Sequence, residues 1–277
     1  MKNKRFKSIY IMVLFLIIPV MGAAQDIISG FLLEKGKMDV ALTFTHESST
    51  EFFVGTEKMD LPAKYKVQSW TAYLAYGLAD NVNIVLNLPY IKATIKDLDL
   101  EEKGAQDAGI FLKWRPVYRK SGGGELSIVL GGGITFPMSE YVHDTLVSIG
   151  NRATSIDGRV CLLYKFNSGL FTELLGGYSL RSDVVPNAYT AGFKAGFAFS
   201  KLYLESWIQI ANSTDGTDIG DINFTLPSTK VNYTRAGVTV YYPIVPKVGI
   251  FIKWFSTLDG RNIKKANSFS SGLVLRL

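Results

Sequence analysis

The sequence predicts an all-β protein: a transmembrane, antiparallel, up-and-down β-barrel of about twelve strands. Three observations support this prediction. Segments of roughly 10 to 14 residues alternate apolar and polar side chains with a period of two. Short and longer connections between these segments alternate along the chain. The chain also begins with the features of an export signal and has no second apolar run long enough for a membrane-spanning helix.

The first 24 residues are predicted to be a signal peptide. An apolar stretch at residues 8–20 is followed by small residues at 22–24, so we expect cleavage before Gln25. The alternative, an uncleaved membrane anchor, is less consistent with an apolar stretch shorter than the ~20 residues that a spanning helix needs. The barrel domain would then comprise residues 25–277. The basic residues that precede the apolar stretch are Lys2, Lys4, Arg5 and Lys7.

Net charge and cysteine content exclude several classes of partner. The chain carries a formal charge of +6, but the signal peptide holds four basic residues and no acidic one, so the mature chain is only about +2. This balance gives no reason to expect nucleic acid as a partner. Cys161 is the only cysteine, so one chain can form neither a disulfide framework nor a thiolate metal site. We expect no cofactor and no metal.

Each predicted strand places apolar residues on one face and small or polar residues on the other. In residues 124–137, for example, Leu126, Ile128 and Leu130 point one way, whereas Ser127 and Gly131 point the other way. A tilted strand crosses a bilayer in ~9–11 residues, which these lengths allow. The predicted strands cover residues 37–46, 65–77, 81–92, 106–117, 124–137, 152–165, 169–181, 188–199, 201–211, 230–242, 247–257 and 266–277.

The alternation of connections indicates which end of the barrel faces outward. Short connections such as residues 78–80 and 243–246 are predicted to be periplasmic turns, and the longer ones extracellular loops. A soluble β-sandwich would have no reason to sort its loops in this way. The predicted long loops cover residues 47–64, 93–105, 138–151, 182–187, 212–229 and 258–265.

Charged residues inside the strands occupy the phase opposite the apolar row. A Lys or Arg facing lipid at mid-membrane costs ~2–4 kcal/mol, so this phase is predicted to face the lumen. Both signs of charge are present, which allows cross-strand pairs and water to satisfy them. The lumen-lining candidates are Lys113, Arg115, Glu125, Asp157, Arg159, Glu173, Lys194, Glu205, Arg235, Lys253 and Arg276.

Two further features fit an outer-membrane protein. Aromatic residues near strand ends, among them Tyr241 and Tyr242, are candidates for the interfacial girdles. The last strand ends with Gly272, Leu275 and Leu277 in a pattern similar to the terminal assembly signal that the barrel-insertion machinery recognises, although many such signals end in Phe. The alternative is an ordinary amphipathic last strand.

Few residues are candidates for chemistry. The two histidines are His46 and His143, and His143 with Asp144 and Ser139 or Ser148 could be drawn as a hydrolase constellation. No match to a phospholipase motif supports it, so solvated loop histidines are preferred and no catalytic residue is assigned.

The loop at residues 213–223 is acidic and rich in glycine. Its carboxylates are Asp215, Asp218 and Asp221, which are hard oxygen ligands of the kind that calcium prefers. Their spacing does not match an EF-hand loop. Calcium binding here is left open beside the simpler interpretation, a solvated acidic loop.

Residues 76–90, which include Tyr76-Gly77-Leu78-Ala79-Asp80 and end in Pro89-Tyr90, form a hairpin pattern. This pattern resembles the outer-membrane transporter family labelled "MetA-pathway of phenol degradation". Residues 106–109 and 133–137 are similar to two further segments of that family, with Gln106 where Gly is usual. The resemblance implies passive uptake of small, aromatic or hydrophobic molecules.

We therefore expect an outer-membrane barrel that is a passive channel for a small solute, in contact with outer-membrane lipid and without enzymatic activity. The alternative is a non-conducting structural or binding barrel that acts through its extracellular loops. Bulky inward residues that bridge a narrow twelve-strand lumen would favour this alternative. The residues in question are Phe111, Phe171, Trp207 and Phe251.

Overall fold

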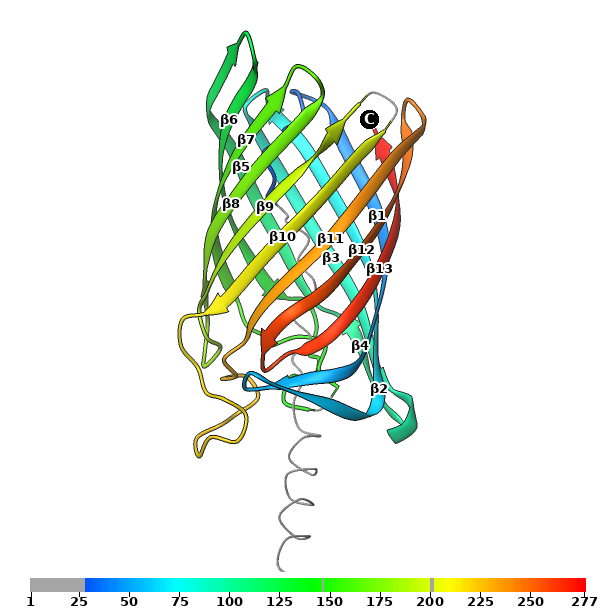
Figure 1. The fold of residues 1–277 in the computed structure, drawn as a ribbon, viewed down its shortest axis with the longest axis vertical. Helices are drawn as coiled ribbons and strands as arrows, with labels where there is room; N and C mark the ends of the chain where they lie inside the picture. Colours follow the sequence, from blue (N-terminus) through cyan, green and yellow to red (C-terminus); the bar gives the residue numbers. More distant parts are fainter. Residues whose placement is uncertain (1–27, 146, 200–201) are drawn as a thin grey trace, which may run out of the picture.

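The computed structural model describes residues 28–145, 147–199 and 202–277. Twelve antiparallel strands form a closed ring in which neighbours in sequence are hydrogen-bonded neighbours in space, and β1 pairs with β13 to complete it (Figure 1). The predicted fold class is therefore confirmed. The predicted signal peptide and its cleavage site lie outside the described residues.

The strands are longer than the sequence predicts, and a short additional strand, β4, lies outside the ring. Their bounds are β1 Met38–Val54, β2 Glu57–Ala79, β3 Val82–Ile95, β4 Leu100–Ala105, β5 Asp107–Ser121, β6 Gly124–Pro137, β7 Ser155–Phe166, β8 Leu170–Arg181, β9 Ala188–Ala198, β10 Tyr203–Ser213, β11 Asn232–Val245, β12 Val248–Arg261 and β13 Lys264–Arg276. A 3-10 turn, η1, covers Lys96–Leu98. No helix in the described ranges is long and apolar enough to span a membrane.

Three stretches predicted to be loops are largely β-structure, so these predictions are wrong. β1 and β2 continue as a hairpin through residues 47–64, and β12 and β13 continue through residues 258–265. Gly55 and Asn262 adopt the left-handed backbone of tight turns, with φ of 54° and 51°. Residues 93–105 contain the end of β3, η1 and β4. Polar side chains predict loops here, but strand ends beyond a bilayer meet water on both faces and lose the apolar alternation.

β3 changes its partner along its length. Residues 82–87 pair with β5, whereas residues 90–95 pair with β4. Pro89 lies between these two ladders, and its carbonyl accepts a hydrogen bond from the Gln106 N–H at 3.0 Å. Because proline has no N–H to donate, the ladder is interrupted at this point. The interruption lets β3 leave β5 and form a separate hairpin with β4.

The outward face of the barrel is apolar. Exposed aromatic residues such as Trp70, Trp114 and Tyr242 lie on it, as expected for interfacial girdles. Tyr241 instead faces the lumen, so its assignment to a girdle is wrong: successive residues of a strand point to opposite faces. Exposed aliphatic and Phe side chains include Leu42, Leu86, Leu88, Ile110, Leu112, Leu130, Ile134, Leu174, Phe193, Ile208, Ile252 and Leu273.

The two ends of the barrel differ. The C-terminus lies at the end with the short turns, here called the inner end (Figure 1). The opposite, outer end carries the β1–β2 hairpin and the loop at residues 214–231. Tyr141, Val147 and Ile149 from the loop at residues 138–154 fold back there, together with Leu226, onto the inner faces of β1–β3. These loops narrow the outer mouth on one side with an apolar cluster.

Candidate functional site: the barrel lumen

Two cavities lie in the lumen among the residues that the structure describes. The outer cavity has a volume of about 280 Å³ and is lined by residues of β1–β3 and β5–β11. The inner cavity has a volume of about 340 Å³ and is lined by β8–β13, with Ser29 and Phe31 on its remaining side. Gln209 of β10 lines both cavities. The two cavities therefore share a lining residue on β10.

A segment that precedes β1 lies inside the barrel against one wall. We call residues 28–37 the lumenal segment. Ile28 is only 2% exposed, and Leu32 and Leu33 pack against the same buried cluster. The residues of the wall beneath the segment are Ala75, Val85, Phe111, Val129, Cys161 and Leu175. These apolar inward residues give the segment a surface to bury, so it occupies that side of the lumen.

Buried polar groups of the wall anchor the backbone of this segment. Glu173 Oε2 accepts a hydrogen bond from the Gly30 N–H at 2.7 Å. The Lys113 ammonium donates to the Phe31 carbonyl at 2.6 Å. Main-chain groups that leave a strand ladder must find partners elsewhere, and hydrogen bonds to charged groups are the strongest replacements. Lys113 and Glu173 thus hold the lumenal segment in addition to facing the lumen.

The four bulky inward residues do not extend across the lumen but lie against its wall. Each is paired with a glycine on the neighbouring strand, and a Cβ atom built on that glycine would lie less than 3 Å from the ring. The ring thus occupies the space that a side chain would take. The four rings therefore lie along the wall of the barrel. The pairs are Phe111–Gly133, Phe171–Gly196, Trp207–Gly237 and Phe251–Gly272.

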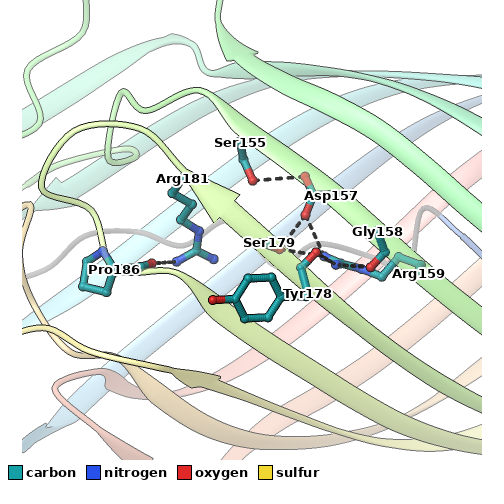
Figure 2. Close-up of polar contacts among 8 residues, drawn as sticks. All are labelled: Ser155, Asp157, Gly158, Arg159, Tyr178, Ser179, Arg181 and Pro186. Carbon is teal, nitrogen blue, oxygen red and sulfur yellow. Dashed lines mark hydrogen bonds and ion pairs between the residues drawn. The ribbon is translucent and has the colours of Figure 1, made fainter.

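The wall of the outer cavity carries a polar network on β7 and β8 (Figure 2). The Asp157 carboxylate accepts hydrogen bonds from Ser155 at 3.1 Å, Ser179 at 2.5 Å and Arg159 at 2.8 Å. Arg181 is the next inward residue after Ser179 on β8 and lines the same cavity. Because each charge has a polar partner, the network keeps a charged surface in the lumen in a defined geometry.

The inner cavity combines positive charge with aromatic rings. The Lys253 ammonium lies 4.5 Å from the centre of the Trp207 ring, and the Arg276 guanidinium lies 4.9 Å from the centre of the Tyr241 ring. These are cation–π distances. The charged residues of its lining are Glu173, Lys194, Glu205, Arg235, Lys253 and Arg276.

The structure places the predicted lumen residues in three environments. Asp157 and Arg159 line the outer cavity, and the six charged residues just named line the inner one. Lys113 lies beneath the lumenal segment. Arg115 and Glu125 lie near the inner end, where Arg115 donates to the Asp80 carbonyl at 2.8 Å and Glu125 pairs with Lys120 at 2.9 Å.

A buried ion pair and the lumenal segment are absent from the sequence predictions. Glu47 and Lys264 form a 3.0 Å salt bridge on β1 and β13. Both continue the inward phase of their strands, so longer predicted strands would have included them. The signal for the segment is the apolar run around Phe31, which directly precedes the first strand.

The serines of the candidate hydrolase constellation are hydrogen-bonded to backbone carbonyls. The Ser139 hydroxyl donates to the Ala105 carbonyl at 2.6 Å, and the Ser148 hydroxyl donates to the Gly150 carbonyl at 2.5 Å. His46 lies within β1, where it pairs with residues of β2 and β13.

The acidic loop has a partner of its own. The Asp218 carboxylate accepts hydrogen bonds from Arg261 Nε and Asn262 Nδ2, both at 2.7 Å. In the described part of the chain, no group of three potential His, Cys, Asp or Glu ligands could hold a metal ion. The carboxylate with the most contacts in this loop thus ties it to the β12–β13 turn.

The fold has relatives among solved outer-membrane proteins. The chain is similar to the COG4313 outer membrane channel from Pseudomonas putida F1, with a TM-score of 0.74 and 14% identity over 90% of this chain and 98% of that one. It is also similar to the NanC porin, with a TM-score of 0.54 and 9% identity over 86% and 100% of the two chains. At these identities the likeness concerns the fold alone. No curated protein matches the sequence.

The family resemblance is confirmed by a direct comparison. The model of the family described as "Putative MetA-pathway of phenol degradation" matches residues 89–271. This region extends from β3 into β13 and includes most of both cavity linings. The chain belongs to this family.

Proposed function

We propose that this protein is a passive outer-membrane channel through which a small solute crosses by diffusion. The observation that carries the proposal is the pair of lumenal cavities, which share Gln209 in their linings. Their linings hold charges of both signs, whereas the outward face is apolar. A polar lumen inside an apolar barrel is suited to solute passage, and its charged residues would set selectivity.

The same proposal covers location and assembly. The mature chain would begin at Gln25, and the barrel-insertion machinery would recognise the last strand through Gly272, Leu275 and Leu277. The side chains of Leu275 and Leu277 are exposed at the inner end. Backbone hydrogen bonds in both directions join Leu277 to Met38, so the last residues also close the ring.

We further propose that passage involves no chemistry. The serines of the candidate hydrolase constellation donate to backbone carbonyls, and the lumenal charges form structural pairs such as Asp157–Arg159. Discrimination among solutes would then follow from the size, charge and ring content of the two cavities.

Conductance of the refolded mature barrel in planar lipid bilayers tests the channel proposal. We expect discrete conductance steps in potassium chloride, because polar and charged side chains line both lumenal cavities. Heat-denatured protein at the same concentration is the control. A barrel that inserts but shows no conductance, and admits no small solute into liposomes, would contradict the proposal.

A non-conducting structural barrel is the second candidate, and one observation favours it. The outer mouth holds the apolar cluster of Tyr141, Val147, Ile149 and Leu226, and the lumenal segment covers one wall. A barrel closed at both places would present only its loops to a partner. The same bilayer measurement separates the two candidates.

A further inference from the structure

We propose that the inner cavity is a binding site for small organic anions that join a carboxylate to an apolar ring. Transport of such anions would rest on the proposed channel function, whereas their binding would not. The proposal combines three features of one cavity: its charge, its rings and its unpartnered donors. Each favours a different part of the ligand.

The charge of the lining favours an anion. Among the described residues, four basic side chains and two carboxylates line the cavity, and Asp39 lies 3.9 Å from Arg276 at its edge. Glu173 faces Lys194 at 3.5 Å and also binds the Gly30 N–H, while Glu205 accepts a hydrogen bond from the Tyr203 hydroxyl at 2.6 Å. Positive charge inside low-dielectric walls raises the local concentration of anions.

Arg235 supplies a guanidinium for the carboxylate. Its side chain is 3% exposed, and its Nε donates to Thr257 Oγ1 at 3.1 Å. Glu47 acts electrostatically on this guanidinium from beyond salt-bridge distance, and its carboxylate pairs with Lys264 at 3.0 Å. A buried arginine is costly unless an anion compensates it, and its planar geometry matches a carboxylate. A ligand carboxylate in the cavity would provide this compensation.

The aromatic rings of the lining favour a ligand whose remaining part is apolar and planar. Trp207 and Phe255 lie with their ring centres 5.8 Å apart on β10 and β12, and Phe31 packs edge-on against Phe171 at 5.2 Å. Aromatic pairs favour offset or edge-on contacts at such distances. Rings with a few polar groups line most small-molecule sites, and a volume of about 340 Å³ is within their usual range.

Two donors in the lining have no partner among the residues that the structure describes. These are the buried Nε1 of Trp207 and the buried Oγ1 of Thr239. The two residues lie close together on neighbouring strands. Trp207 of β10 is paired with Gly237 of β11, and Thr239 of β11 is paired with Glu205 of β10. An unpaired buried donor loses free energy that a ligand oxygen can restore. A carboxylate that reaches either atom would satisfy it.

Calorimetric titration of the refolded mature barrel tests the binding site. The probes are benzoate, benzyl alcohol as a ring without charge, and acetate as a charge without a ring. We expect benzoate to bind more tightly than either. Lys253→Gln should weaken benzoate binding by about tenfold, because it removes one positive charge from the lining of the cavity. It should leave benzyl alcohol nearly unchanged. Lys165→Gln is the matched control, because Lys165 is an inward lysine that lines neither cavity.

A second variant keeps the test valid if a charge substitution perturbs folding. Trp207→Phe retains a ring but removes the N–H donor, so benzoate binding should fall by about threefold while thermal stability is retained. Equal binding of benzoate and benzyl alcohol, or an equal effect of Lys253→Gln and Lys165→Gln, would overturn the site. A barrel that binds benzoate selectively but does not conduct would contradict the channel and leave the site intact.

Discussion

Two walls of the lumen share the same alternating strand pattern but differ in the polarity of their inward side chains. The wall formed by β3 and β5–β7 presents Val85, Val129 and Cys161, and the lumenal segment covers it. The wall formed by β9–β13, here called the open wall, presents Lys194 and Lys253 and faces the inner cavity. Apolar inward residues attract chain to bury, whereas charged residues lose hydration if chain covers them. The polarity of each wall thus decides which side of the lumen is filled.

Removal of the segment should have its largest effect on the reactivity of Cys161. This is the only cysteine in the chain, is fully buried, and lies with Sγ 3.6 Å from the Ile28 carbonyl. Buried thiols are inert, so the intact barrel should resist a water-soluble thiol reagent, and deletion of residues 28–34 should accelerate labelling by more than about tenfold. Mass spectrometry measures the labelled fraction. Ser29→Ala, which leaves the backbone anchors in place, is the control, and equally slow labelling of the deletion variant would contradict the covered wall.

The same deletion should raise the unitary conductance, by about twofold or more, because it widens a narrow twelve-strand lumen. Single-channel recording in planar bilayers measures the change. Lys113→Met should act in the same direction but less strongly, since it removes the hydrogen bond to the Phe31 carbonyl and leaves the apolar contacts of the segment. An unchanged conductance in both variants would mean that the open wall alone forms the route.

A substitution at Gly237 tests whether the glycines of the open wall provide the space that the aromatic rings occupy. A Cβ at Gly237 would lie 2.7 Å from Trp207 Cζ2 and 2.5 Å from the Trp254 carbonyl oxygen. Gly237→Ala should therefore destabilise the barrel by about 1–3 kcal/mol, as overpacking does, and lower its conductance as the ring moves into the lumen. Urea unfolding in lipid vesicles measures the stability. Gly158→Ala is the control, because its Cβ would meet no atom within 4 Å, and equal stability of the two variants would contradict this role of the glycines.

The smallest effect is expected at the outer rim beside the open wall. Hydrogen bonds from Arg261 and then Asn262 hold the pKa of Asp218 below its usual range. Since the folded state favours the charged carboxylate, this stabilisation is present above the ordinary aspartate pKa and is lost as pH falls through the lowered pKa. Asp218→Asn should remove this pH dependence and cost less than about 1 kcal/mol, because the pair is partly exposed.

Hydrogen exchange of residues 214–231 at several pH values measures the effect. Asp215→Asn is the matched control, since Asp215 is an exposed carboxylate of the same loop. Loss of protection in the Asp215 variant, with none in the Asp218 variant, would contradict a clamp at Asp218.

β10 shows which features of the lumen can be predicted from the sequence and which cannot. The period-two pattern places Glu205 and Trp207 on the inner face without any knowledge of neighbours, since alternation is a property of one strand. It does not show that Gly237 lies beneath the Trp207 ring, because cross-strand register depends on turn geometry and on the extent of both strands. The sequence therefore predicts that Trp207 faces the lumen, but it does not predict that the Trp207 ring lies over Gly237 on the barrel wall.

The lengths of the strands are predicted less well than their faces. Residues 47–64 carry a polar pattern typical of loops, yet most of them pair across the β1–β2 hairpin. Outside a bilayer the two faces of a strand meet the same solvent, and hydropathy no longer distinguishes a strand from a loop. Glu47 and Lys264 were missed because they lie beyond the predicted strand ends.

The sequence by itself determined the fold class, the family and the inward phase of strands such as β10, because apolar alternation and turn residues act locally and a membrane admits few architectures. Only the tertiary structure decided how the lumen is divided. The place of residues 28–37 depends on apolar residues of β3, β6 and β7, which come together only when the ring closes. The inner cavity likewise exists only where six strands bring separate cations and rings around one volume.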